Sequence, residues 1–157
     1  MKKWILITTL SIVIIIGITI KVYFKAVEPV RTAEERAISI AEQQTDLKTT
    51  DDFYLYNGTE SYSVITGTNS KGQKVIIWVP DKDENIYVRR ASEGITREKA
   101  LQKLYDEKKP SEVIYTRLGI EYNRPLWEIN YRNDQDLLNY YYIDFVTGEE
   151  LKDIENL

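Results

Sequence analysis

The chain has 157 residues, with 21 basic and 25 acidic side chains and a net charge of −4. It contains neither cysteine nor histidine, which excludes disulfides and thiol chemistry and removes the usual general base and metal ligand at neutral pH. The first 25 residues carry four lysines and no acidic residue, so the rest has 17 basic and 25 acidic side chains, a net charge of −8. This charge makes nucleic acid and anionic lipid head groups poor partners.

The segment from Trp4 to Ile20 has no charged residue and is flanked by lysines at both ends. Its 17 residues would span roughly 26 Å as a helix, and snorkelling of Lys21 would extend the span through Phe24 towards the bilayer thickness of about 30 Å. We therefore expect residues 1–25 to hold a cytoplasmic start and a single transmembrane anchor. A cleaved signal peptide is the alternative, but bulky residues follow the segment where small ones are needed.

The orientation of this anchor is predicted from its position in the chain. Two lysines lie on each flank, so the positive-inside rule barely favours either orientation. A hydrophobic segment at the extreme N-terminus, followed by the folded body of the protein, is typical of a signal anchor. We therefore expect a single-pass protein of the plasma membrane with its body outside the cytoplasm, and the lack of cysteine fits an exported Gram-positive protein.

The next segments predict a first unit of one helix and several strands. Residues 26–31 are expected to form a linker, and Thr32 and Glu35 have the spacing of a capping box at a helix start. Ala37, Ile40 and Ala41 recur at helical spacing and predict its buried side. Runs rich in β-branched and aromatic residues, separated by turn signals, predict strands at residues 52–56, 60–66, 74–79 and, shorter, 86–90.

The same order of elements then recurs. Thr96 is predicted to cap a second helix, and Pro110 to prevent its continuation. Strands are predicted at residues 112–122, 126–131 and 138–145. Aligning the two helices places Tyr62 and Val64 roughly on Trp127 and Ile129.

This recurrence predicts an α+β fold with two domains, residues 32–92 and residues 93–157. Each is expected to consist of a helix followed by three main strands, with the helix packed on one face of a small antiparallel sheet. Domains of about 60 residues bury little surface alone, so we expect the two to pack together.

The chain resembles the TseB-like family of cell-wall elongation regulators of Gram-positive bacteria, which combine an N-terminal transmembrane helix with two PepSY-like, cystatin-like domains. The residues that carry the resemblance are the anchor, the helix starts at residues 32–37 and 96–100, and the strand endings at residues 78–80 and 144–149. The resemblance implies a non-catalytic protein that binds a class B penicillin-binding protein, a transpeptidase, outside the membrane. PepSY domains also occur in protease propeptides and inhibitors, so an inhibitor or chaperone-like module for an exported peptidase is the alternative.

Few residues suggest catalysis or ligand binding. The acidic turn at residues 81–85 begins like a calcium loop, but Ile86 stands where the loop needs glycine. No Gly-x-Ser-x-Gly, Ser-x-x-Lys or phosphate-binding glycine loop is present after the anchor. We therefore expect no catalytic residue, no metal and no cofactor. The sequence does not predict an oligomeric state.

Aromatic side chains are the better candidates for a binding surface. Strand alternation places Val75, Ile77 and Val79 on an inward face and leaves a set of aromatic residues on the opposite faces of their strands. Tyrosine and tryptophan are enriched at binding hot spots. The candidate partner-binding residues are Tyr54, Tyr56, Trp78, Tyr115, Tyr140 and Tyr142. An alternative stays open, in which this aromatic surface is the contact between the two domains.

Overall fold

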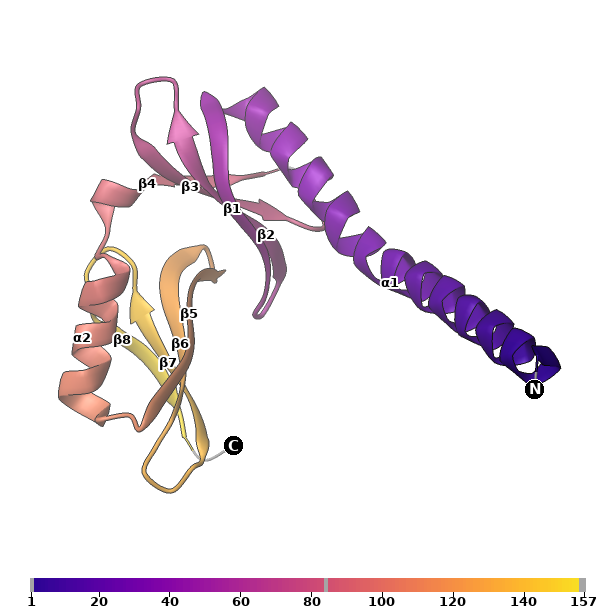
Figure 1. The fold of residues 1–157 in the computed structure, drawn as a ribbon. Coiled ribbons are helices and arrows are strands. Elements are labelled where there is room, and N and C mark those ends of the chain that lie inside the picture. Colours follow the sequence, from indigo (N-terminus) through magenta and orange to yellow (C-terminus); the bar gives the residue numbers. More distant parts are fainter. Residues whose placement is uncertain (1, 84, 156–157) are drawn as a thin grey trace. The chain divides into compact units, whose positions relative to one another are not determined.

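The structure is a computed structural model that describes residues 2–83 and 85–155, without the side chains of Lys2 and residues 5–11. It divides into two compact units, the first ending at Arg36 and the second beginning at Ala37. Figure 1 shows the order of the elements along the chain.

Helix α1 runs without interruption over Lys2–Gln44. The predicted linker at residues 26–31 is therefore wrong, and Thr32 lies inside the helix instead of capping one. Its hydroxyl donates to the carbonyl of Glu28 at 2.9 Å, one turn earlier. Pro29 removes one backbone hydrogen bond, yet the helix continues past it, and Arg31 pairs with Glu35 at 3.6 Å on the next turn.

The predicted membrane anchor lies in the first half of α1. Within the described part of the chain, no helix is both long enough and apolar enough to span a membrane. Residues 5–11, which belong to the predicted anchor, lie outside the residues whose side chains are described. The anchor therefore stays a prediction.

The first sheet is antiparallel and follows chain order. It comprises β1 (Leu47–Asn57), β2 (Ser61–Asn69), β3 (Lys74–Pro80) and β4 (Tyr87–Arg90). Register shifts interrupt the pairing of β1 with β2 between Leu47 and Thr49 and between Thr50 and Asp52. All four predicted strands are confirmed, although β1 begins five residues earlier than predicted because its polar first half pairs with β2.

The second half of the described chain repeats this arrangement with a separate helix. A short 3₁₀ turn at Ala91–Glu93 leads to α2 (Arg97–Lys108) and to the antiparallel strands β5 (Glu112–Glu121), β6 (Arg124–Arg132), β7 (Leu138–Asp144) and β8 (Glu150–Ile154). The hydroxyl of Thr96 accepts a hydrogen bond from the N–H of Lys99, which confirms the predicted cap. Strand β8 was not predicted, so this sheet has four strands where three were expected.

Two apolar cores hold these layers together. Ala37, Ile40 and Ala41 of α1 pack on a face of the first sheet that includes Ile77, and this small core confirms the predicted inward face. The larger core joins Ala100 and Leu104 of α2, the second sheet and the other face of the first sheet. Figure 1 shows α2 lying along the second sheet. Each sheet is therefore covered by a helix on one face, as predicted.

Candidate functional site

Tyr54 of β1 contacts the edge of the second sheet. Its hydroxyl accepts a hydrogen bond from the N–H of Leu118 at 2.9 Å and donates one to the carbonyl of the same residue at 3.0 Å. Leu118 lies on β5, which is an edge strand. Its backbone N–H and carbonyl therefore have no neighbouring strand to pair with on the side of Tyr54. Burial raises the pKa of the Tyr54 phenol, which keeps the hydroxyl protonated and able to donate.

Tyr56, two residues later in β1, packs against Gly119 of β5 in the second sheet. A Cβ atom on Gly119 would come within 2.4 Å of the Tyr56 ring, so only glycine leaves room for it. The Arg117 guanidinium lies 5.2 Å from the centre of this ring, and the phenol donates to the Glu121 carboxylate at 3.3 Å. Tyr56 is fully buried as a result.

Trp78 of β3 is the third candidate residue that contacts the second half of the chain. It is fully buried, and its ring meets that of Phe145 edge to face, with centroids 6.4 Å apart. In the structure Tyr54, Tyr56 and Trp78 therefore make contacts within the chain. This agrees with the alternative in which the aromatic surface joins the two domains. Partner binding by these three residues stays an untested prediction.

The other three candidates share one face of the second sheet, which we call the outer face because it lies opposite α2. Pairing register places Arg117, Glu128, Tyr142 and Lys152 in one row across this face. Tyr115 and Tyr140 lie in the next row, on either side of Asn130. Tyr140 and Tyr142 stack with ring centroids 6.4 Å apart.

The Glu128 carboxylate organises the centre of the outer face. It is 3% exposed and accepts hydrogen bonds from the Tyr115 hydroxyl at 2.8 Å and from Nε of Arg117 at 2.9 Å. The guanidinium also lies 4.8 Å from the Tyr115 ring centre. Burial raises the pKa of both Tyr115 and Tyr142; the next cause is the hydrogen bond to Glu128 for Tyr115 and the Glu128 charge for Tyr142, so both phenols stay neutral at physiological pH.

Sequence reasoning missed the polar residues of this face. Arg117 and Glu128 lie on the same side as the tyrosines by strand alternation, so the period of two could have grouped them. Their ion pair, at 2.7 Å, could not be predicted because it depends on the register between β5 and β6. Within the described part of the chain, no cluster of three or more acidic side chains could hold a metal ion.

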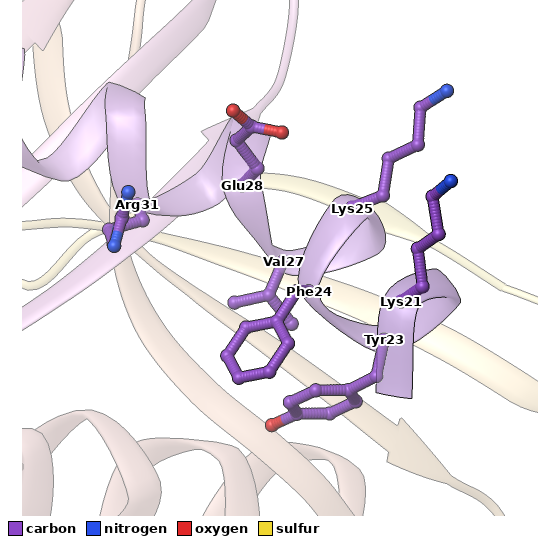
Figure 2. Close-up of a pocket in the computed structure, with 7 residues that line it drawn as sticks. All are labelled: Lys21, Tyr23, Phe24, Lys25, Val27, Glu28 and Arg31. Carbon is purple, nitrogen blue, oxygen red and sulfur yellow. The ribbon is translucent and has the colours of Figure 1, made fainter. Parts of the chain in front are cut away.

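A second group of exposed side chains lies on α1. Figure 2 shows Tyr23, Phe24 and Val27 projecting from one side of the helix and Lys21 and Lys25 from another. The hollow beside these side chains is lined by seven residues between Lys21 and Arg31, all from this one helix, so it is an open helix surface and not an enclosed site. The Tyr23 and Phe24 rings meet edge to face, with centroids 5.9 Å apart.

Comparison with known proteins places this architecture in a family. Residues 36–80 match the family described as "Cell wall elongation regulator TseB-like domain", and residues 94–154 match "Peptidase propeptide and YPEB domain". The chain is 32% identical to "Probable cell wall elongation regulator TseB" of Bacillus subtilis (strain 168), across 98% of both chains. The chain belongs to the TseB-like family of cell wall elongation regulators.

A solved structure agrees with this assignment. The YpmB protein from Bacillus subtilis superposes with a TM-score of 0.73 at 35% identity, covering 77% of this chain and 95% of that protein. The resemblance to the TseB-like family that the sequence indicated is confirmed. For this TseB-like protein, the two family matches fall on the two halves that carry the two sheets.

Proposed function

We propose that this protein is a non-catalytic, membrane-anchored regulator of cell-wall elongation that binds a class B penicillin-binding protein outside the plasma membrane. The observation that carries the proposal is the 32% identity, across 98% of both chains, to a protein named as a probable cell wall elongation regulator. A similarity that extends over the N-terminal helix and both sheets supports a shared role for the whole chain.

The first half of α1 supports the membrane anchor. Apolar side chains from Ile12 to Val22 are more than half exposed, and burying such a surface in hydrocarbon is favourable. Tyr23 follows them with Lys21 and Lys25 on another side of the helix, as Figure 2 shows. Tyrosine and lysine are the residues that lie at membrane interfaces, so they fit the outer end of a single-pass span.

The outer face of the second sheet supports the binding role. Tyr115 and Tyr140 are half-buried and Tyr142 is 8% exposed, whereas Tyr56 and Trp78 are fully buried between the sheets. The hydrogen bond from its hydroxyl to Glu128 fixes Tyr115 before any partner binds, which lowers the entropic cost of binding. We therefore assign the partner contact to Tyr115 and Tyr140, and the buried Tyr142 supports Tyr140 by stacking on it. Two proteins in one membrane meet at a raised effective concentration, so a contact of modest area suffices.

In-cell crosslinking and affinity purification of the full-length protein test this proposal, with residues 1–31 alone as the control. Specific recovery of a penicillin-binding protein is the expected result. Tyr140→Ala should reduce this recovery, while Tyr105→Ala, on the exposed side of α2, should leave it unchanged. Circular dichroism must show both variants folded. Equal recovery with wild type and with the anchor alone would refute the proposal.

The alternative function, an inhibitor or chaperone-like module for an exported peptidase, is favoured by one observation. The family matched by residues 94–154 is described by its occurrence in peptidase propeptides. The same purification distinguishes the two functions, because a recovered peptidase would point to the alternative. Slowing of that peptidase by a stoichiometric amount of the full-length protein would then establish it.

A further inference from the structure

Strand β5 has an open edge next to the Tyr54 contact. Both backbone groups of Leu118 bond to Tyr54, so they point away from β6, the strand with which β5 pairs. In an antiparallel pair this orientation recurs at every second residue. Ile120 agrees with the alternation, because it lies opposite Pro125, which has no N–H to offer. The N–H and the carbonyl of Thr116 therefore also point away from β6.

Thr116 has three polar groups that the rest of the described chain leaves without a partner. Its outward N–H and carbonyl form no backbone hydrogen bond, and no other strand lies beside them. Its hydroxyl oxygen is buried and has no hydrogen-bond partner either. Proteins rarely leave a buried hydroxyl unpaired, because the loss of water is then not compensated. At Leu118, two residues later, Tyr54 fills the corresponding place.

A groove lies beside this open edge. A hollow of about 310 Å³ is lined by Tyr54 and Thr66 of the first sheet and by Thr116 and Leu118 of the second. A second hollow, of about 250 Å³, has Thr66 and Leu118 in common with the first, so the two are continuous. Apolar side chains line much of the second hollow, among them Val75, Ile76, Ile95, Trp127 and Phe145.

The charges around the groove balance. Lys74 and Arg117 each form an ion pair with a carboxylate at 2.7 Å. The other charged residues that line the groove are one acid and one base, Asp52 and Arg97. The groove therefore complements an uncharged occupant. What it lacks is an acceptor for one N–H, a donor for one carbonyl and a partner for one hydroxyl, and the first two are the groups of an extended peptide backbone.

We propose that this groove binds an extended, uncharged segment of a partner protein, which pairs its backbone with Thr116 as an added strand at the edge of β5. The segment donates to the carbonyl of Thr116 and accepts from its N–H, and an apolar side chain of the segment enters the second hollow. Tyr54 ends the pairing at Leu118. The inference rests on the proposed function in one respect, namely that the partner is a protein.

The test uses the full-length protein in detergent micelles and two labelled probe peptides, measured by fluorescence anisotropy. Both probes have the uncharged sequence Ser-Val-Thr-Val-Ser with capped ends. In the second probe the three central residues carry N-methyl groups, which keep the side chains but remove the N–H groups needed for strand pairing. We expect the methylated probe to bind at least about tenfold more weakly. Equal binding of the two probes would overturn the inference.

Thr116→Val separates binding from folding. Valine keeps the shape of the side chain and removes the unpaired buried hydroxyl, so this variant should be at least as stable as the wild type on thermal unfolding. It should nevertheless bind the unmethylated probe about fivefold more weakly, because the hydroxyl loses its hydrogen bond to the probe. Thr50→Val, at an exposed threonine of β1, is the matched control and should leave binding unchanged. Unchanged binding by Thr116→Val would contradict the assignment of this edge.

Failure of this inference and failure of the proposed function give different results. If the edge does not bind a peptide, the two probes bind alike, while the wild-type protein still recovers the penicillin-binding protein in cells. If the proposed function is wrong, no penicillin-binding protein is recovered, while the probes still differ. A dimer in analytical ultracentrifugation that Thr116→Val weakens would show that a second copy occupies the edge, and would also overturn the inference.

Discussion

The hydroxyl of Tyr54 bonds to both backbone groups of Leu118, accepting from its N–H and donating to its carbonyl. A single phenol therefore takes the place that a residue of a neighbouring strand would take at the edge of β5. The contact closes this point of an edge strand to pairing with other chains. It also joins the two sheets through an interaction with fixed geometry.

Tyr54→Phe should lower the free energy of unfolding by about 1–3 kcal/mol, because both backbone groups of Leu118 lose their partner in a partly buried place. Urea unfolding followed by circular dichroism measures the change. Tyr105→Phe removes a hydroxyl from an exposed tyrosine of α2 and should have almost no effect. Equal losses in the two variants would contradict this role for Tyr54.

Gly119→Ala should destabilise the fold by about 1–3 kcal/mol, because the new methyl group would overlap the Tyr56 ring. A double-mutant cycle identifies the cause. If the ring is responsible, Gly119→Ala costs markedly less in a Tyr56→Ala background than in the wild type. An unchanged cost in that background would show that the glycine is required for another reason.

Glu128→Gln should cost about 1–3 kcal/mol, since it removes the charge that pairs with Arg117 and binds the Tyr115 hydroxyl in a buried position. Glu112→Gln is the matched control. Its pair with Arg132 is exposed, at 3.7 Å, and should contribute less than about 1 kcal/mol. Thermal unfolding of both variants at one pH compares them directly, and a larger loss for Glu112→Gln would contradict the prediction.

Asp144→Asn should remove part of the acid sensitivity of the protein. Burial opposes the charged form of Asp144, but hydrogen bonds from the backbone of Thr147 and Val146 and from Arg124 outweigh it and hold the pKa of this carboxyl below its ordinary value of 3.8. The carboxylate therefore stabilises the fold at neutral pH, and this contribution is lost as the pH falls from 3.8 through the lower pKa of the folded state.

The measurement is urea unfolding of the wild type and Asp144→Asn at pH 7 and near pH 3. We expect the variant to be less stable by about 2 kcal/mol at pH 7 and the difference to shrink in acid. Asp136→Asn changes an exposed aspartate that also pairs with an arginine, and it should shift stability little at either pH. A difference for Asp144→Asn that does not depend on pH would contradict the linkage.

The strands of this protein were predictable because alternation and turn signals are local. The same local reasoning failed at α1, where Pro29 and the cap-like Thr32 indicated a boundary but the helix continues through both. It also missed β8, whose five residues are charged or only half-buried at an edge of the sheet. Such a strand has no apolar pattern to recognise and forms because β7 offers it backbone partners.

The sequence alignment of the two halves was one residue out of register in β2, and this error assigned side chains to the wrong face of the strand. It placed Tyr62 and Val64 on Trp127 and Ile129. In the structure Ile65, not Val64, faces the core that contains the end of α1, while Val64 belongs to the larger core with the second sheet. A shift of one residue moves a side chain to the opposite face of a strand, and weak sequence similarity does not determine that shift.

The sequence by itself determined the repeated order of helix and strands, the cap at Thr96, the inward faces of the sheets and the resemblance to a regulator family, because these depend on residue types at short spacing. Only the tertiary structure decided that Tyr56 and Trp78 are fully buried between the sheets while Tyr140 is half-buried. Strand alternation alone grouped all three as candidates for one binding surface. Which of them meets a second layer depends on how distant segments pack, and no local pattern encodes that.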